Sequence, residues 1–414
     1  MIRMVRSLVM TRLLFPEVYG LMTLVWTALT GLQMFADTGI GTAIVRDARG
    51  DDRAFLNTAF TTNVLRGVVL WLASCAIAYP IALIYHQPPL AVLLPATGLT
   101  ALVHGFVSTS IYTRRRHMDF RRLAVLDIST ELVTFVVLVA WAYFERTVWP
   151  LVGGAVVGQI FMVIASHKYL PGIRNRFQWD KSSLDTFMGF GKWVYLSSMV
   201  YFMSTQSDRL LLGRYLDIVH LGIYGTATVL SGAMQTLVLK INSDVLYPAY
   251  AKVAQEGGAR LKQVMLRVRL ATDAGMMLPI ALVMVLGSQV VTLLYDPRYH
   301  DAGWMLQVLC VRLLLVAIIS NGESCLTALG YPKYSLFDNS ARAIAMIAAI
   351  PIGWSLWGVK GVIWAIALSE VPPLLVIWGG LLKHRIFSIV AESRSLLFVA
   401  LGSLIGWAVS FLWR

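Results

Sequence analysis

The sequence predicts an all-α protein that crosses a membrane many times. Hydrophobic residues make up 57% of the 414 residues and charged residues only 14%, and the mean hydropathy is +0.69. A soluble protein carries charge on roughly a quarter of its residues. The composition therefore excludes a soluble multidomain enzyme, and long apolar runs separated by short charged loops indicate membrane-spanning helices.

Apolar stretches of about 20 residues are long enough to cross the hydrocarbon core of a bilayer as helices. Twelve such spans are predicted, and a short apolar fragment precedes Pro16. The spans lie near residues 20–45, 60–85, 90–112, 123–144, 149–168, 184–213, 218–247, 268–295, 302–329, 335–356, 359–381 and 395–413.

Charge alternates sharply between the loops that join these spans. One set of loops is rich in arginine and lysine, whereas the alternate set is short and carries few basic residues. Because lysine and arginine in short loops resist translocation, the basic set is predicted to face the cytoplasm. This topology also accounts for the formal net charge of +13 without a nucleic-acid partner. The basic set comprises Arg46, Arg49, Arg53, Arg114, Arg115, Arg116, Arg121, Arg122, Lys168, Arg174, Arg176, Lys181, Lys252, Arg260, Lys262, Arg267, Arg269, Lys383, Arg385 and Arg394.

A short pattern occurs twice, about half the chain apart. Segment Arg12–Gly20 and segment Gly213–Gly225 each combine a basic residue at a helix end, a short outward turn, and Tyr-Gly opening the next helix. An even number of predicted spans separates the copies, so both have the same orientation. This favours two lobes related by an axis along the membrane normal, with chance agreement of short turns as the alternative.

The first copy of the pattern follows a helix that is too short to cross a membrane. Only Met1–Thr11 precedes Arg12, and a helix of roughly twelve residues rises about 18 Å, less than the ~30 Å hydrocarbon core. We expect either a shortened first lobe or a start that lies downstream of the true one. No cleavable signal peptide is expected before the first span.

The two copies lie in segments that resemble bacterial polysaccharide exporters. Segment Arg12–Arg46, with its Pro-Glu, Tyr-Gly and Asp-x-Gly elements, is similar to the start of these proteins. Segment Ser207–Leu230, SDRLLLGRYLDIVHLGIYGTATVL, is similar to their second-lobe signature. On these motifs the chain is identified as a member of the Wzx-type oligosaccharide flippases, in the multidrug/oligosaccharidyl-lipid/polysaccharide superfamily.

The resemblance implies two pseudo-symmetric six-helix bundles around a central cavity. The spans of this chain give about 12–13 transmembrane helices, with an incomplete first helix as a departure from the family. The bundles are expected at residues 1–170 and 184–381, with an additional helix at 395–413. The implied cargo is an undecaprenyl-diphosphate-linked oligosaccharide, moved across the bacterial inner membrane for lipopolysaccharide, capsule or exopolysaccharide assembly. The expected partners are this lipid-linked oligosaccharide, membrane lipids and downstream polymerase machinery.

Three basic residues are predicted to lie inside spans, where a charge costs about 2.5–3.5 kcal/mol at a helix centre and marks a functional candidate. Arg66 and Lys240 lie above the cytoplasmic ends of their helices, and Arg312 lies near mid-depth. A guanidinium binds phosphate oxygens bidentately, so all three are predicted contacts for a lipid diphosphate. For Arg66 and Lys240, snorkelling to the interface is an equal alternative.

Two acidic residues inside spans are candidates for ion coupling. Glu131 follows Asp127 by four residues, and Glu370 stands just before the helix-breaking pair Pro372 and Pro373. A carboxylate in either place is a predicted proton or sodium site. The alternative is a hydrogen bond to a neighbouring helix.

Structural roles are expected for most other charged residues in the spans. Asp208 and Arg209 are predicted to cap the outward turn or to form a gate, and Asp338 and Arg342 to form a same-face ion pair. Helix packing is expected for Asp37. Solvated or loop-paired positions near cytoplasmic ends are expected for Asp244, Asp273 and Glu323.

Catalytic and metal-binding patterns are lacking in the sequence. The seven histidines are scattered, and Cys75, Cys310 and Cys325 lie in apolar runs without metal-ligand spacing. We therefore expect no enzyme activity, cofactor or metal. Two other functions stay open: a drug/cation antiporter of the same superfamily, which needs an acidic cavity, and a membrane glycan polymerase or ligase, which needs a long outward loop.

Overall fold

The computed structural model describes residues 2–36, 39–254 and 258–412, without the side chains of residues 2–4, 188–197 and 258–259. Asp37 lies outside the described residues. Helices are the only long regular elements in the described ranges, where no strand occurs, so the predicted all-α class is confirmed. The chain divides into two compact units, Met1–Phe202 (unit 1) and Met203–Arg414 (unit 2).

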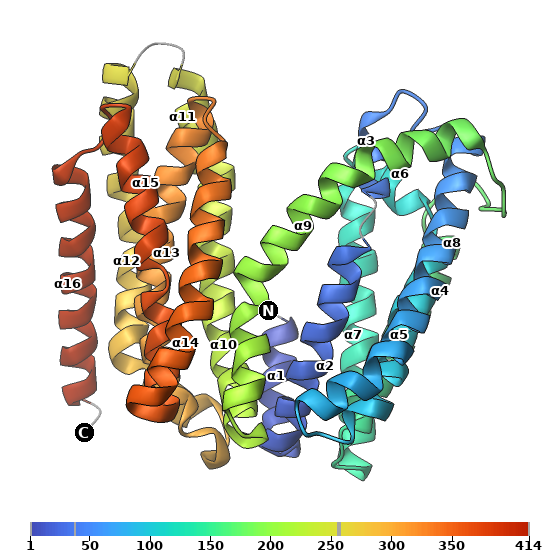
Figure 1. The fold of residues 1–414 in the computed structure, drawn as a ribbon, viewed down its shortest axis with the longest axis horizontal. Helices are drawn as coiled ribbons and strands as arrows, with labels where there is room; N and C mark the ends of the chain where they lie inside the picture. Colours follow the sequence, from blue (N-terminus) through green and yellow to red (C-terminus); the bar gives the residue numbers. More distant parts are fainter. Residues whose placement is uncertain (1, 37–38, 255–257, 413–414) are drawn as a thin grey trace. The chain divides into compact units, whose positions relative to one another are not determined.

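Unit 1 is built around α5, which packs against α4 and α8, while α7 packs against α8 and the short α1. Pro16 opens α2 at its first turn, where a proline costs no hydrogen bond. The helices of unit 1 are α1 (Ile2–Leu13), α2 (Pro16–Phe35), α3 (Ile40–Arg46), α4 (Arg53–Ile84), α5 (Leu90–Gly105), α6 (Ser110–Arg116), α7 (Phe120–Phe144), α8 (Trp149–Tyr169) and the first part of α9 (Lys181–Tyr215) (Figure 1).

The first part of α9 is held in unit 1 by polar and aromatic contacts. The Arg49 Nη1 group donates a hydrogen bond to the Ser182 hydroxyl at 3.0 Å. The rings of Phe55 and Phe187 pack with centroids 4.8 Å apart. Because of these contacts, the first part of α9 belongs to unit 1, and the boundary between the two units lies inside α9.

Asp180 stands just before α9 and accepts hydrogen bonds from its first turn. Its Oδ2 atom accepts from the Ser183 hydroxyl at 2.6 Å, the Ser183 N–H at 2.9 Å and the Ser182 hydroxyl at 2.9 Å. These bonds, led by the Ser183 hydroxyl, favour the charged form and lower the pKa of the Asp180 carboxyl. Asp180 therefore acts as the helix cap.

Unit 2 is arranged around α13, which packs against α10, α12, α14 and α15. Of its most apolar stretch, 67% is buried, against 17% for the peripheral α16. A charged side chain on α13 therefore needs partners within unit 2. Besides the end of α9, unit 2 contains α10 (Ile218–Ile241), a π-helical turn (Asn242–Leu246), α11 (Tyr247–Val253), α12 (Gly258–Leu294), a 3₁₀ turn (Pro297–Tyr299), α13 (Ala302–Ala328), α14 (Lys333–Leu368), α15 (Val371–Lys383) and α16 (Ile389–Leu412).

Eight segments of the described chain are long and apolar enough to cross a membrane, or nine when the bent pair α5 and α6 counts as one span. One of these eight segments, Lys333–Lys383, turns back within α14 and therefore contains two of the predicted spans, 335–356 and 359–381. The predicted spans 184–213 and 218–247 are α9 and α10, whose polar residues lower their hydropathy. The predicted multi-pass membrane protein is therefore confirmed.

The turn within α14 joins two arms that pack closely. Trp357 and Gly358 depart from helical geometry, and Gly358 has a φ of 56°, which favours glycine. The backbones of Gly353 and Gly361 touch across the turn, so that a Cβ added to either would overlap the other's carbonyl oxygen. Small residues thus allow the close approach of the arms, and the predicted division between 356 and 359 is confirmed.

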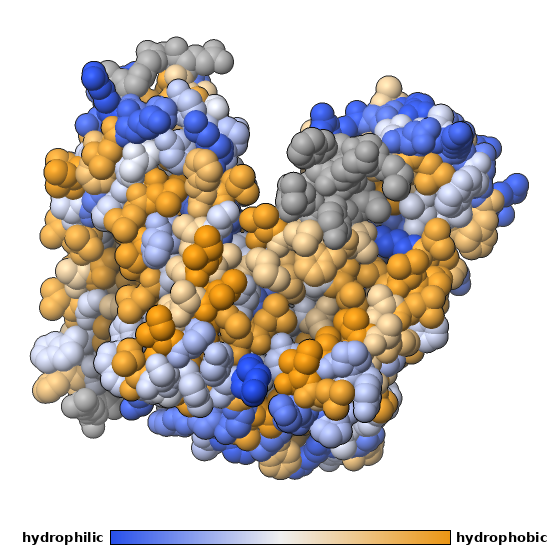
Figure 2. Space-filling model, viewed as in Figure 1, coloured by the Kyte–Doolittle hydropathy of each residue, from blue (hydrophilic) through white to orange (hydrophobic). Residues whose placement is uncertain are grey.

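Large apolar side chains lie exposed along the helices. On α4 they include Leu65, Val69 and Leu72, each more than half exposed. Figure 2 shows hydrophobic residues along the helix flanks and hydrophilic residues gathered toward helix ends. A surface of this kind is stable against lipid chains and not against water.

Two predicted spans have different bounds in the structure. The span expected at 90–112 is broken, because α5 and α6 are bent by 62°. At the break, the backbone N–H groups of Ser108 and Thr109 donate to the side chains of Ser166 and Asn175. The span expected from residue 268 belongs to α12, which begins at Gly258, so basic residues assigned to a loop lie in a helix.

Candidate functional site

A cluster of charged side chains lies in unit 2, where α14 ends and α15 begins. Glu370 is the residue before α15, and its side chain is completely buried. Its Oε1 atom accepts a hydrogen bond from Arg312 Nε of α13 at 3.0 Å, and its Oε2 atom accepts one from Arg342 Nε of α14 at 2.8 Å. One buried carboxylate therefore holds two guanidinium groups from two helices.

The two arginines differ in how they use their remaining donors. Arg342 also donates from Nη1 to the Asn339 side chain at 2.8 Å, and its Nη2 lies 3.6 Å from Asp338 Oδ2. This confirms the predicted pair of Asp338 and Arg342. In the described part of the chain, Arg312 hydrogen-bonds only through Nε. Both Nη groups of Arg312 thus keep donors for a further acceptor.

The accessible edge of this cluster is cationic. The side chains of Arg312 and Arg342 are 16% and 13% exposed, whereas those of Glu370 and Asp338 are 0% and 1% exposed. A guanidinium fork matches the oxygens of a phosphate, so the cluster can bind an anion at Arg312 without losing the pair with Glu370. Among the described residues, no group of three His, Cys, Asp or Glu side chains could hold a metal ion.

Asp208 extends the cluster from α9. The buried Tyr224 hydroxyl of α10 donates to Asp208 Oδ2 at 2.6 Å, and both groups interact electrostatically with Arg312. The prediction that Asp208 caps the outward turn is wrong, because α9 continues past it. Asp217 caps α10 instead, accepting a hydrogen bond from the His220 N–H at 2.8 Å.

The other two predicted headgroup contacts have different surroundings. Arg66 of α4 donates from Nη2 to the carbonyl oxygen of Gln33 at 3.0 Å, in unit 1. Lys240 of α10 is exposed, and no side-chain partner for it occurs in the residues that the structure describes. A contact of either residue with a headgroup stays a prediction.

Both carboxylates predicted for ion coupling are paired with arginine. Glu131 Oε2 of α7 lies 3.0 Å from Arg6 Nη1 of α1, the bond to a neighbouring helix that the sequence left as the alternative. Each of these carboxylates already has a guanidinium partner, and a role of Glu131 or Glu370 in ion coupling stays a prediction. Arg209 donates to Gln206 at 3.1 Å, and its role in a gate stays a prediction.

A second buried cluster joins α12 to α16. Arg269 Nε lies 3.1 Å from Asp273 Oδ2, and Arg269 Nη1 lies 2.6 Å from Glu392 Oε1. The Ser395 hydroxyl donates to Asp273 Oδ2 at 2.6 Å. The expected solvated position of Asp273 is wrong: α12 begins earlier than predicted, and α16 covers Asp273, which is 2% exposed. In the sequence, the spacing of four residues between Arg269 and Asp273 indicates that the two side chains can pair on one helix face.

Comparisons with known proteins agree on one family. The model of the family described as polysaccharide biosynthesis protein matches residues 9–304. The lipopolysaccharide biosynthesis protein WzxC of Escherichia coli (strain K12) is 24% identical over 380 residues, which cover 89% of this chain and 75% of that protein.

Two solved structures are similar in fold. The lipid II flippase MurJ, in an inward closed conformation, has a TM-score of 0.74 at 12% identity and covers 99% of this chain and 98% of its own. An inward-facing multidrug resistance MATE family transporter of the MOP superfamily has a TM-score of 0.71 at 13% identity, with 95% and 94% covered. At these identities, the likeness concerns the fold.

Proposed function

The chain belongs to the polysaccharide biosynthesis protein family, and from this premise we propose that it is a flippase for a lipid-linked oligosaccharide. The proposed cargo is an undecaprenyl-diphosphate-linked oligosaccharide that passes from the cytoplasmic to the outer leaflet of the bacterial inner membrane by alternating access. The exported glycan serves lipopolysaccharide, capsule or exopolysaccharide assembly. Translocation requires binding and release of the cargo, and no covalent step.

One observation carries this proposal: Arg312 is fixed on a central membrane helix with its Nη donors uncommitted. The pair with Glu370 offsets the cost of placing a guanidinium at this depth. An anionic diphosphate gains two parallel charge-assisted hydrogen bonds at the open Nη edge. We therefore assign headgroup binding to Arg312 and positioning of its guanidinium to Glu370 and Arg342.

The remaining assignments follow from this role. Arg66 and Lys240 are proposed as further headgroup contacts, each within its own unit. Downstream polymerase machinery is the proposed recipient of the exported glycan. The two repeated lobes are proposed to correspond to 1–170 and 184–381, with the segment 395–413 as an additional helix.

Two other functions fit the cluster less well. A drug/cation antiporter binds cationic cargo, which the exposed edges of Arg312 and Arg342 repel. The likeness to a multidrug transporter lies in the fold alone. A glycan polymerase or ligase needs a long outward loop, and the loops predicted to face outward are short.

The flippase proposal is tested with purified full-length protein in proteoliposomes. A fluorescently labelled undecaprenyl-diphosphate oligosaccharide is supplied, and a membrane-impermeant quencher reports how much label has changed leaflet. We expect transfer with the protein and none in empty vesicles. Absence of transfer by well-folded protein would contradict the proposal, and movement of a cationic dye in its place would favour the antiporter.

A further inference from the structure

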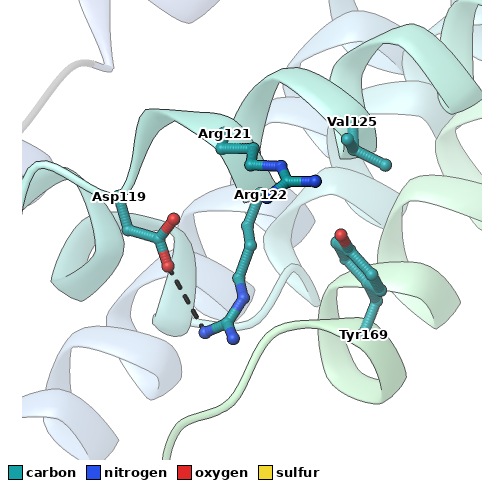
Figure 3. Close-up of a pocket in the computed structure, with 5 residues that line it drawn as sticks. All are labelled: Asp119, Arg121, Arg122, Val125 and Tyr169. Carbon is teal, nitrogen blue, oxygen red and sulfur yellow. Dashed lines mark ion pairs between the residues drawn. The ribbon is translucent and has the colours of Figure 1, made fainter.

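A pocket lies at the cytoplasmic end predicted for α7, in unit 1. Its volume is about 360 Å³, and it is lined by Asp119, Arg121, Arg122, Val125 and Tyr169. Figure 3 shows Arg122 reaching toward Asp119, and Tyr169 facing the start of α7 from the end of α8. The pocket thus combines two guanidinium groups with an aromatic ring, at the depth where lipid headgroups lie.

The charges of the pocket favour an anion. Arg122 Nη1 lies 3.3 Å from Asp119 Oδ2, and Arg114 Nη1 lies 3.6 Å from the same atom. Arg121 is exposed and has no partner in the described ranges of the chain. With Arg114 included, three arginines lie around one carboxylate, so positive charge exceeds negative charge at the pocket. The Asp119 side chain does not cap α7, so the first-turn N–H groups add to the positive potential.

An exposed apolar stripe continues from Arg121 along the same face of α7. Val125, Ile128, Leu132 and Val136 follow at intervals of three or four residues, and they are 45%, 51%, 48% and 62% exposed. From Arg121 to Val136 the helix rises about 22 Å, more than half of the ~30 Å hydrocarbon core. Only 17% of the most apolar stretch of α7 is buried, so the stripe offers an apolar surface for an acyl chain.

We propose that this pocket and stripe bind an anionic phospholipid of the cytoplasmic leaflet. The phosphate contacts Arg121 and Arg122, and an acyl chain lies along the stripe. The phosphodiester of a phospholipid can contact Arg121, which has no partner in the described ranges, while Arg122 and Arg114 keep their pairs with Asp119. The site is distinct from the Arg312 cluster of unit 2 and does not depend on the function proposed above.

The proposal is tested by native mass spectrometry of the full-length protein in detergent, titrated with dioleoylphosphatidylglycerol. We expect Arg121→Gln to weaken lipid binding about tenfold, because the phosphate loses its charge-assisted hydrogen bonds to the guanidinium. Arg146→Gln is the matched control, since Arg146 is an exposed arginine just beyond the opposite end of the same helix. It should bind the lipid as the wild type does.

A second variant and two other lipids complete the test. Ile128→Asn, in the middle of the stripe, should also weaken binding, because it places a polar amide against the acyl chain. Thermal unfolding midpoints equal to that of the wild type would show that both variants fold. Equal losses in Arg121→Gln and Arg146→Gln would overturn the proposal. Equal binding of dioleoylphosphatidylcholine would do the same, as would tighter binding of undecaprenyl diphosphate at this pocket.

Discussion

Replacing Arg312 and Glu370 together by glutamine separates a headgroup-binding role of Arg312 from a purely structural one. In Arg312→Gln alone, Glu370 loses one of its two guanidinium partners and stays completely buried. In the double variant Arg312→Gln/Glu370→Gln, one positive and one negative charge are removed together. The two amides can still form a hydrogen bond where the ion pair now spans 3.0 Å.

The structure sets the expected magnitudes. Removing one partner of a buried ion pair lowers the free energy of unfolding by about 3–5 kcal/mol. Arg342 continues to neutralise Glu370, so we expect Arg312→Gln to lie at the lower end, about 3 kcal/mol. The double variant leaves Arg342 its contact with Asp338 at 3.6 Å and leaves no buried carboxylate at position 370, so it should be destabilised less than Arg312→Gln. Both variants lack the Nη donors, so both should lose export.

Export is measured as surface glycan, with a fluorescent lectin, on cells that depend on each variant. Immunoblots give protein abundance, and thermal unfolding in detergent gives stability. Arg214→Gln is the control, because Arg214 is an exposed arginine outside the cluster. If the stable double variant exports glycan like the wild type, Arg312 acts only in the structure and the headgroup proposal is refuted.

Three further predictions concern stability. The charged Asp180 carboxylate stabilises α9 at pH values above its unfolded-state pKa of about 4, and this contribution is lost as the pH falls through the lowered folded-state pKa. The thermal unfolding midpoint should therefore fall more steeply in acid for the wild type than for Asp180→Asn. Parallel curves for the two proteins would contradict this role of Asp180. Gly353→Leu should lower the free energy of unfolding by about 1–3 kcal/mol or more, because the added Cβ meets the backbone of Gly361. It should also broaden the size-exclusion peak, whereas Gly379→Leu, with open space at its Cβ, should not. Identical profiles for the two variants would contradict the close packing of the two arms of α14. Arg269→Gln should lower the free energy of unfolding by about 3 kcal/mol, whereas Arg267→Gln, at an exposed position, should change it by less than about 0.5 kcal/mol. An unchanged thermal unfolding midpoint for Arg269→Gln would disprove the buried pairing.

The predictable part of the fold rests on properties that act along the chain. Apolar length and alternating loop charge predicted the spans, because each depends on consecutive residues and on the thickness of a bilayer. The division of Lys333–Lys383 was predicted for the same reason, from a short polar turn between two apolar runs. The break between α5 and α6 was missed, because it depends on hydrogen bonds from Ser108 and Thr109 to distant side chains.

The candidate site was only partly predictable, because its pairs join different helices. The spacing of Asp338 and Arg342 gave their pair, since both lie on one helix. The pairing of Glu370 with arginines 58 and 28 residues away in sequence depends on how α13 and α14 pack beside the start of α15. A single sequence predicts that a deep charge needs a partner, but packing selects which residue it is.

The sharp turn within α14 has a consequence for the biosynthesis of the chain. Arg342 lies on one arm of the resulting hairpin, and Glu370 lies just beyond the other arm. The Nε atom of Arg342 is 2.8 Å from the Oε2 atom of Glu370. Each charge alone would oppose partitioning from the translocation channel into lipid by about 2.5–3.5 kcal/mol. A hairpin that leaves the channel as one piece, held by Gly353 and Gly361, carries them out as a neutral pair, so the nascent chain avoids two separate insertion barriers.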